Sequence, residues 1–203
     1  MSERQNNPEV SGDDVFLVEA FQNGRGPADA FSTLVVRYQD RVFNLCFRFM
    51  GSYEEADDCA QEVFLKVFRS LKDFRGESAF ATWLYRITVN TCKNRLVSRE
   101  YRDRRRTVSI DVPVQTEEGE VATEIKDESL SPERKLDTEE KNALIQEAIS
   151  SLPVDQRELV VLRDIESLSY AEIVRITGLT MGTVKSKLSR GRRALCEKLR
   201  RLV

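Results

Sequence analysis

The chain has 203 residues, of which 40% are hydrophobic and 33% are charged, a composition typical of a soluble globular protein with one or two domains. Its formal net charge is only −2, so the overall balance does not single out a nucleic-acid-binding protein. No apolar run is long enough for a membrane helix, and the polar N-terminus lacks the apolar core of a signal peptide. We therefore expect a cytoplasmic protein with no membrane insertion.

The four cysteines argue against a metal site. Cys46, Cys59, Cys92 and Cys196 are far apart in the sequence, form no C-x-x-C pair, and have no histidine to join them. We interpret them as core residues or reduced thiols and expect neither a metal nor a cofactor. The sequence also lacks a phosphate-binding glycine loop and a recognisable catalytic group, so it predicts a protein that is not an enzyme.

The first half of the chain is helical by its apolar spacing. Helices are expected over residues 13–23 and 27–50, and Ser52 with Glu55 matches a capping box that opens a third helix over 53–71. The third helix has an outward polar face that surrounds one leucine, formed by Asp58, Gln61, Glu62 and Leu65. This pattern is typical either of an ordinary exposed leucine or of a docking point for a partner.

A loop over residues 73–78 precedes a long helix over 79–106, for which Ser78 is the expected N-cap. Between its two apolar edges runs a polar strip, bordered by Trp83 and formed by Arg86, Asn90 and Lys93. An aromatic ring beside cations suits single-stranded DNA, because bases stack on rings while phosphates pair with cations. The alternative is that Trp83 and Tyr85 are core residues and that the arginines over residues 99–106, at the helix end, are only solvated.

Residues 107–130 have no helical or alternating period and predict a flexible acidic linker. From residue 107 to residue 140 eleven acidic residues face three basic ones, whereas from residue 170 onward nine basic residues face two acidic ones. This segregation of charge matters more than the net sum, because it places the cations on one segment.

The last segment predicts a helix-turn-helix. Two earlier helices are expected, one from Pro132 to about residue 152 and one from Pro153. Two further helices then meet at a turn in which Gly178 ends the first and Thr180 caps the second. The second helix buries one apolar side and presents an outward polar face formed by Thr183, Ser186, Arg190 and Arg193, with Lys185, Lys187 and Arg192 at its flanks. Such a helix fits the major groove of DNA, although cations also favour helix C-termini in general.

The sequence therefore predicts an all-α fold of two small helical bundles. The first spans residues 1–106, the flexible acidic linker spans 107–130, and the second bundle with the helix-turn-helix spans 131–203. A stand-alone helix-turn-helix regulator would account for the second bundle alone. It would not account for Leu65 in its polar ring or for the strip beside Trp83, and no symmetric dimer surface can be identified.

Two stretches resemble the extracytoplasmic-function class of bacterial sigma factors, closest to its envelope-stress type. They are DDCAQEVFLKVFRSLKDFRGESAFATWLYRITVNTCKNRL, from residue 57, and LPVDQRELVVLRDIESLSYAEIVRITGLTMGTVKSKLSRGRRAL, from residue 152. The resemblance implies a subunit that binds core RNA polymerase through the β′ coiled coil and the β flap and directs initiation at specific promoters. It also implies a membrane-linked anti-sigma factor as a partner.

The resemblance also implies roles for particular residues. The face of Asp58, Gln61, Glu62 and Leu65 matches the surface that contacts the β′ coiled coil. The loop and helix that open the −10 element correspond to Arg75, Ser78, Phe80, Trp83, Arg86, Asn90 and Lys93. The −35 readers correspond to Tyr170, Lys185, Ser186 and Arg190. Two positions depart from family patterns, since Leu84 replaces a second tryptophan and Ser189 replaces an aromatic residue found in some relatives.

The linker has two possible uses. From the sequence alone it is a solubilising tether between two DNA-binding domains. The resemblance implies instead an acidic segment that threads the polymerase's nucleic-acid channels in place of RNA phosphates.

Overall fold

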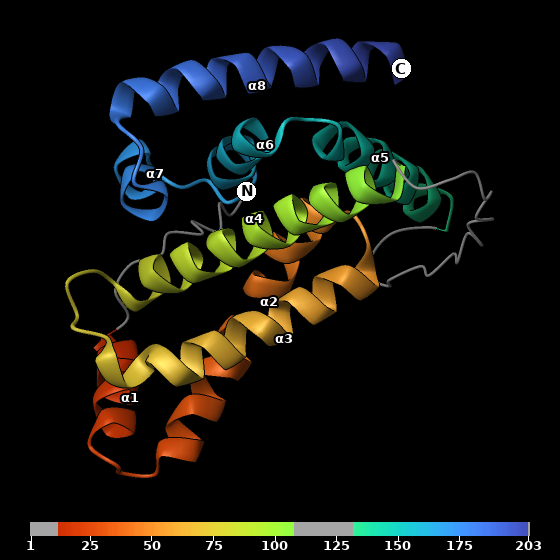
Figure 1. The fold of residues 1–203 in the computed structure, drawn as a ribbon. Helices are drawn as coiled ribbons and strands as arrows, with labels where there is room; N and C mark the ends of the chain where they lie inside the picture. The colour runs from red at the N-terminus through yellow and green to blue at the C-terminus, as the bar shows by residue number, and fades with distance from the viewer. Residues whose placement is uncertain (1–11, 108–131, 203) are drawn as a thin grey trace.

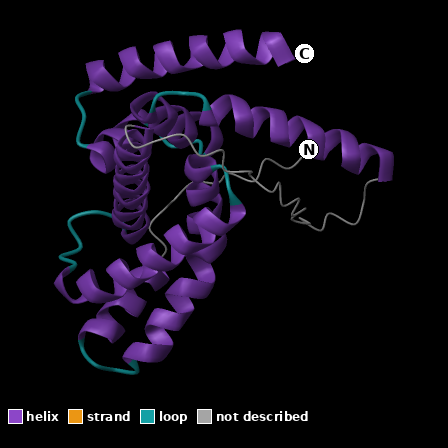
Figure 2. Cartoon of the chain, turned by 45° about the vertical axis from the view of Figure 1, so that its right-hand side comes forward, coloured by secondary structure: helices purple, strands orange, loops and turns teal. Residues whose placement is uncertain are grey.

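The computed structural model describes residues 12–107 and 132–202, and there every regular element is a helix (Figure 2). The all-α prediction is confirmed. The predicted linker, apart from its first residue, lies outside the described residues, as do the first eleven residues of the chain. In the described ranges no helix combines the length and the apolar character needed to cross a bilayer.

The helices follow the predicted ranges closely. The N-terminal half contains α1 (Gly12–Gln22), α2 (Pro27–Met50), α3 (Tyr53–Ser70), the 3₁₀ turn η1 (Leu71–Asp73) and α4 (Phe80–Thr107). The C-terminal half contains α5 (Pro132–Ser150), α6 (Val154–Val160), the π-helical turn η2 (Val161–Ile165), α7 (Tyr170–Thr177) and α8 (Met181–Leu202). The π-helical turn was not predicted from the sequence.

Helices α2 and α3 pack on each other and form the centre of the N-terminal bundle. The connection between them is short because Gly51 adopts φ 78°, and its N–H donates to the carbonyl of Phe47 at 2.9 Å. Helix α1 is attached to α2 through the buried carboxylate of Asp14, which accepts hydrogen bonds from Tyr38 Oη and Arg37. Burial of Tyr38 and its hydrogen bond to Asp14 raise the pKa of the Tyr38 hydroxyl.

Two predicted helix caps are wrong. Ser52 has the extended backbone of an N-cap, but its side chain makes no capping hydrogen bond. Glu55 instead forms an ion pair with Arg99 of α4 at 2.6 Å, so a tertiary partner replaces the local one. Ser78 precedes the start of α4 by two residues, and its hydroxyl donates to the carbonyl of Ala79 at 3.3 Å.

The C-terminal bundle is built around the contact of α6 with α8. Val184 and Leu188 of α8 are buried against the apolar residues of α6 and α7. Gly191 lets the two helices approach closely, because a Cβ added there would lie 2.9 Å from Val160 Cγ2. This contact sets the distance between the recognition helix and the rest of the bundle.

The two halves pack directly against each other along α4, which runs between them (Figure 1). Tyr85 Oη of α4 donates to Glu166 Oε2 at 2.7 Å, and Lys93 Nζ pairs with Glu158 Oε2 at 3.0 Å. Burial raises the pKa of both glutamates. Arg157 donates to the backbone carbonyl of Phe49, which ties α6 to the end of α2.

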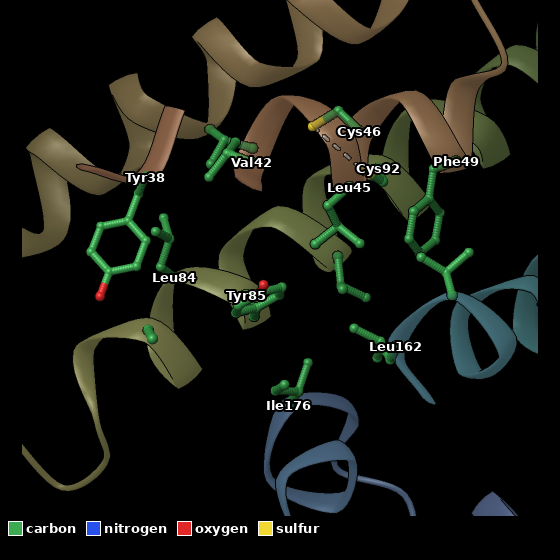
Figure 3. Close-up of a cluster of buried hydrophobic side chains, with 14 of the residues drawn as sticks. Tyr38, Val42, Leu45, Cys46, Phe49, Leu84, Tyr85, Cys92, Leu162 and Ile176 are labelled. Atoms are coloured by element: carbon green, nitrogen blue, oxygen red, sulfur yellow. Dashed lines mark hydrogen bonds between the residues drawn. The ribbon is translucent and has the colours of Figure 1, made fainter. Parts of the chain in front are cut away.

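The apolar core is continuous across this boundary (Figure 3). Leu162 and Ile176 from the C-terminal half approach Leu84 and Tyr85 of α4 and Phe49 of α2. The sequence predicted two bundles and gave no sign that they share a core. In this structure they form one packed unit, which we call the closed arrangement.

The close approach at Gly191 leads to a stability prediction. We expect Gly191→Ala to lower the free energy of unfolding by about 1–3 kcal/mol, because the new methyl group overpacks against Val160. The matched control is Gly182→Ala, in the same helix with no atom near the added Cβ, which we expect to stabilise by up to about 1 kcal/mol. Chemical unfolding followed by circular dichroism measures both. Equal effects of the two substitutions would contradict the packing role of Gly191.

Candidate nucleic-acid and polymerase interfaces

The helix-turn-helix has the local structure that its sequence predicts. Helix α7 begins with a complete capping box, in which Ser169 Oγ accepts from Glu172 N at 3.2 Å and Glu172 Oε2 accepts from Ser169 N at 2.8 Å. Gly178 ends this helix with φ 71°. Thr180 Oγ1 then accepts from Thr183 N at 3.3 Å and caps α8.

The outer face of α8 carries most of the predicted −35 residues. Lys185, Ser186, Arg190 and Arg193 are exposed, and Thr183 is half-buried. The opposite side of the helix is buried through Val184 and Leu188. The helix therefore presents hydroxyls and cations on one side while its apolar side fixes its orientation.

Other predicted −35 residues are held by contacts inside the bundle. Lys187 Nζ pairs with Asp155 Oδ2 of α6 at 2.7 Å, and this pairing lowers the pKa of Asp155. Tyr170 is half-buried at the start of α7, with the guanidinium of Arg163 5.0 Å from its ring centre. These two side chains border the outer face of α8 but are less accessible than Arg190.

Part of the polar strip on α4 is exposed to solvent, and part of it contacts the C-terminal half of the chain. Arg86 and Asn90 are exposed, whereas Lys93 is half-buried in its ion pair with Glu158. In the closed arrangement Lys93, which the sequence predicted to bind DNA, is therefore paired with the carboxylate of Glu158.

The aromatic residues at the start of α4 form a cluster. Trp83 is half-buried, with its ring centre 4.9 Å from that of Phe74 and 5.8 Å from that of Phe80. Phe80 itself is buried and also contacts Tyr38, so its ring supports Trp83 and does not lie on the surface. Helical spacing places Phe80 on an apolar edge of this helix, in agreement with its burial, and only the family resemblance implied a −10 role for it.

The loop before α4 lines a surface hollow with the strip. Arg75 is exposed, Ser78 is half-buried, and both line the hollow together with Trp83 and Arg86. Arg175 of α7 lines it from the C-terminal half. Sequence reasoning did not identify Arg175, because nothing local marks a residue that reaches the hollow from another part of the chain.

The outward face of α3 is exposed as predicted. Leu65 is 56% exposed, and the neighbouring Phe68 adds a second apolar side chain to the surface. Asp58 and Gln61 are exposed and Glu62 is half-buried.

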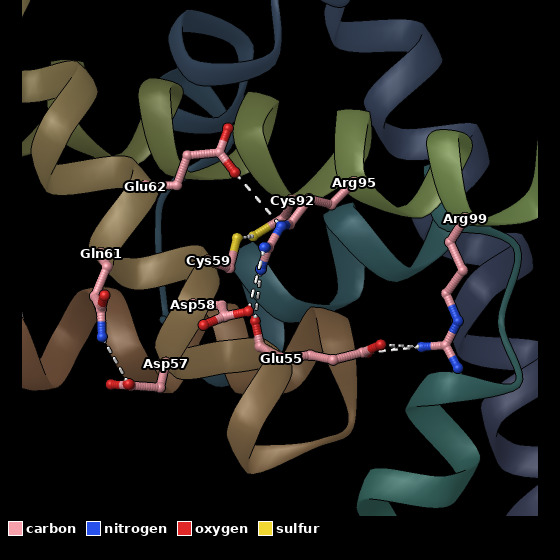
Figure 4. A network of polar contacts seen from close by, with 9 residues as sticks. All are labelled: Glu55, Asp57, Asp58, Cys59, Gln61, Glu62, Cys92, Arg95 and Arg99. Carbon is pink, nitrogen blue, oxygen red and sulfur yellow. Dashed lines mark hydrogen bonds and ion pairs between the residues drawn. The ribbon is translucent and has the colours of Figure 1, made fainter. Parts of the chain in front are cut away.

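The acidic groups of this face are held by α4 (Figure 4). Arg95 bridges Asp58 at 3.5 Å and Glu62 at 3.4 Å. Lys66 also pairs with Glu62, at 2.7 Å. The carboxylates are therefore fixed around Leu65 and do not move independently of α4.

The structure also brings together three cysteines that the sequence keeps apart. Cys46, Cys59 and Cys92 come from α2, α3 and α4, and all three are buried, while Cys196 is exposed on α8. The expectation of no metal site rested on sequence spacing, which does not report on neighbours that come from different helices.

Two family models match the chain, one in its N-terminal half and one in its C-terminal half. The Sigma-70 region 2 family matches residues 34–107, and the Sigma-70 region 4 family matches residues 142–195. The RNA polymerase sigma-H factor of Pseudomonas aeruginosa is 41% identical over 187 residues, covering 92% of this chain and 94% of that protein. The ECF RNA polymerase sigma-E factor of Escherichia coli K12 is 42% identical over 191 residues, covering 94% and 96%.

Two solved structures share the fold. CnrH in complex with the cytosolic domain of CnrY aligns with a TM-score of 0.62 at 21% identity, over 92% of this chain and 97% of that one. The sigma factor RpoE of Bartonella quintana, in complex with the anti-sigma factor NepR, aligns with a TM-score of 0.61 at 21% identity, over 84% and 96%. These likenesses describe the arrangement of helices only.

Both sigma-70 regions are present in order, and the identity to sigma-H and sigma-E extends along nearly the whole chain. This chain therefore belongs to the extracytoplasmic-function family of RNA polymerase sigma factors and is an alternative sigma factor that directs transcription initiation.

Proposed function

We propose that this sigma factor reads the two promoter elements with different helices. The outer face of α8 reads the −35 duplex, while the loop over residues 73–78 and the α4 strip open the −10 element and hold one strand. The observation that carries the proposal is the separation of cations on the surface. Lys185 and Arg190 project from α8, whereas Arg86 projects from α4 beside the half-buried Trp83.

We further propose the division into an N-terminal sigma domain over residues 1–106, a linker over 107–130, and a C-terminal sigma domain over 131–203. The positions of the two family matches support these boundaries. The face around Leu65 docks on the polymerase β′ coiled coil, and the C-terminal domain contacts the β flap. Because it acts with polymerase on the chromosome, the protein works in the cytoplasm and has no catalytic activity of its own.

The closed arrangement has to open for this function. Lys93 is paired with Glu158 in the closed arrangement, so the full strip becomes available to DNA only when the two halves separate. Opening replaces that internal carboxylate with backbone phosphates, which bind the same cation. The −35 face of α8 needs no such change, because Lys185 and Arg190 are already exposed.

An anti-sigma factor is a further partner that we propose. The structurally similar RpoE of Bartonella quintana is bound to the anti-sigma factor NepR. For this chain, a membrane-linked anti-sigma factor would prevent initiation by covering the polymerase-binding and DNA-binding faces.

Reconstituted transcription tests the proposed function as a whole. Core RNA polymerase with this chain should initiate at a promoter that has defined −35 and −10 elements, and core polymerase alone should not. Initiation that is independent of either element would contradict the division of labour between α8 and α4.

The first prediction concerns the α3 face. We expect Leu65→Asp to weaken binding to core polymerase at least about tenfold, because it places a charge in the apolar centre of the docking face. Thermal stability should change little, since Leu65 is exposed. The matched control is Phe16→Asp, another exposed apolar residue, located on α1. Equal affinities of the two variants in a binding titration would reject the docking face.

The second prediction concerns −35 recognition. We expect Arg190→Ala to cost about 1–3 kcal/mol of binding and to relax preference at one base pair, because Arg190 can reach guanine O6 and N7. Lys187→Ala should weaken all sequences alike and reduce the salt dependence. Titrations against single-base variants of the −35 element distinguish the two. A uniform loss for Arg190→Ala would make Arg190 a phosphate contact.

The third prediction concerns promoter opening. We expect Arg86→Ala to permit the closed promoter complex and to reduce the open complex, because Arg86 stabilises a strand whose base has been unstacked. A promoter with a pre-melted bubble should restore activity. The control is Arg25→Ala, an exposed arginine between α1 and α2. Permanganate reactivity of the bubble measures opening, and failure of the pre-melted promoter to rescue would count against a melting role.

A further inference from the structure

Three thiols converge inside the N-terminal bundle. Cys59 Sγ lies 3.7 Å from Cys92 Sγ, and Cys92 Sγ lies 3.8 Å from Cys46 Sγ. All three sulfur atoms lie within 4.8 Å of one another, and the three residues have no exposed surface. Figure 3 shows Cys46 facing Cys92, and Figure 4 shows Cys59 facing Cys92.

These two separations are close to those of sulfur atoms bonded to one ion. With an ion–sulfur bond of about 2.3 Å, pairs of ligands lie about 3.8 Å apart in a tetrahedral site and about 3.4 Å apart in the trigonal pyramid of a trivalent ion with a lone pair. The thiols therefore need only small shifts to share a central ion. Each comes from a different helix, so the cluster is held in place by the packing of α2, α3 and α4.

The donor set limits which ion fits. Thiolates select soft ions. A structural zinc site needs four ligands, but within the described ranges no other cysteine, histidine or carboxylate joins the three sulfur atoms. The cluster also belongs to the hydrophobic core, where a complex with net charge is costly. Three thiolates give a neutral complex only with a trivalent ion.

We propose that Cys46, Cys59 and Cys92 form a three-thiolate site for trivalent arsenic, or for a metalloid ion of the same charge and coordination. Arsenous acid would exchange its three hydroxyl groups for the three sulfurs. Each thiol gives up its proton, each departing hydroxyl leaves as water, and three As–S bonds replace three As–O bonds. The oxidation state of arsenic and of every sulfur stays unchanged, so no oxidant or reductant is required.

Occupancy of the site would link three helices. Cys59 lies next to Asp58 in α3, and Cys92 lies next to Lys93 in α4, so the bound ion would sit beneath both proposed binding faces. A ligand that binds the folded chain but not the unfolded chain raises the stability of the fold. Because the thiols are buried, binding requires a transient opening of the bundle and should be slow.

The test uses the full chain and sodium arsenite, with a phosphine reductant because thiol reductants compete for arsenic. Native mass spectrometry should show one arsenic per chain with the loss of three protons, and the thermal midpoint should rise. Arsenic X-ray absorption should show three sulfur neighbours. Cys92→Ala should weaken binding at least about tenfold, whereas the matched control Cys196→Ser, at the exposed cysteine, should bind like the unmodified chain.

Several results would overturn the proposal. The first is loss of arsenite binding in Cys196→Ser. The second is an arsenic centre with fewer than three sulfur neighbours. The third is tight binding of Cu(I) or Zn(II) by a chain that does not bind arsenite. Absence of any uptake would show that the thiols are only packed core residues. Formation of a disulfide between two of them under mild oxidation, without arsenite uptake, would also overturn it. The absorption experiment uses the unmodified chain, so its answer does not depend on whether Cys92→Ala folds.

Discussion

The packing of α4 against the C-terminal half of the chain is the constraint on which the other features depend. Tyr85 and Lys93 of this helix contact Glu166 and Glu158 of the C-terminal half, and both glutamates are buried. Burial raises the pKa of both glutamates, while the contacts with Lys93 and Tyr85 act in the opposite direction, so keeping the two carboxylates ionised in the closed arrangement costs free energy. The contribution of Glu158 and Glu166 to the stability of the closed arrangement is therefore full at acidic pH, and it is lost as pH rises through their raised pKa values. Near neutral pH the interface is held by polar contacts whose desolvation is expensive, which suits an arrangement that has to open.

Because of this packing, the −35 face of α8 and the polar strip of α4 differ in how accessible they are to DNA. Lys185, Arg190 and Arg193 of α8 face solvent because its apolar side packs on α6 and α7, so these −35 residues are accessible in the closed chain. Lys187 remains paired with Asp155. The polar strip of α4 is only partly available to DNA in the closed chain, because Lys93 is paired with Glu158. The same helix also fixes the polymerase-binding face, because Arg95 holds Asp58 and Glu62 around Leu65. Helix α4 thus connects the proposed docking, melting and interdomain contacts.

The local features of the fold could be predicted from the sequence, and the long-range ones could not. Apolar spacing located the helices, Gly178 and Thr180 located the helix-turn-helix, and helical phase placed Leu65 on the surface. The Ser52 cap failed because Glu55 found a partner in α4 instead. The shared core and the cysteine cluster join residues that are distant in sequence and carry no periodic signal. Helical spacing placed Phe80 on an apolar edge of α4, whereas its ring contacts with Tyr38 and Phe74 involve other elements and could not be predicted.

The distance between the two halves, measured before and after polymerase binds, tests the central claim most directly. One spin label can be placed on the exposed Cys196 of α8 and a second on Val36→Cys, at an exposed position of α2, while the buried thiols are protected from labelling. The free chain should give one narrow distribution of distances between the labels, and the chain bound to core polymerase should give a longer mean distance. The same distance in both states would contradict an opening along α4.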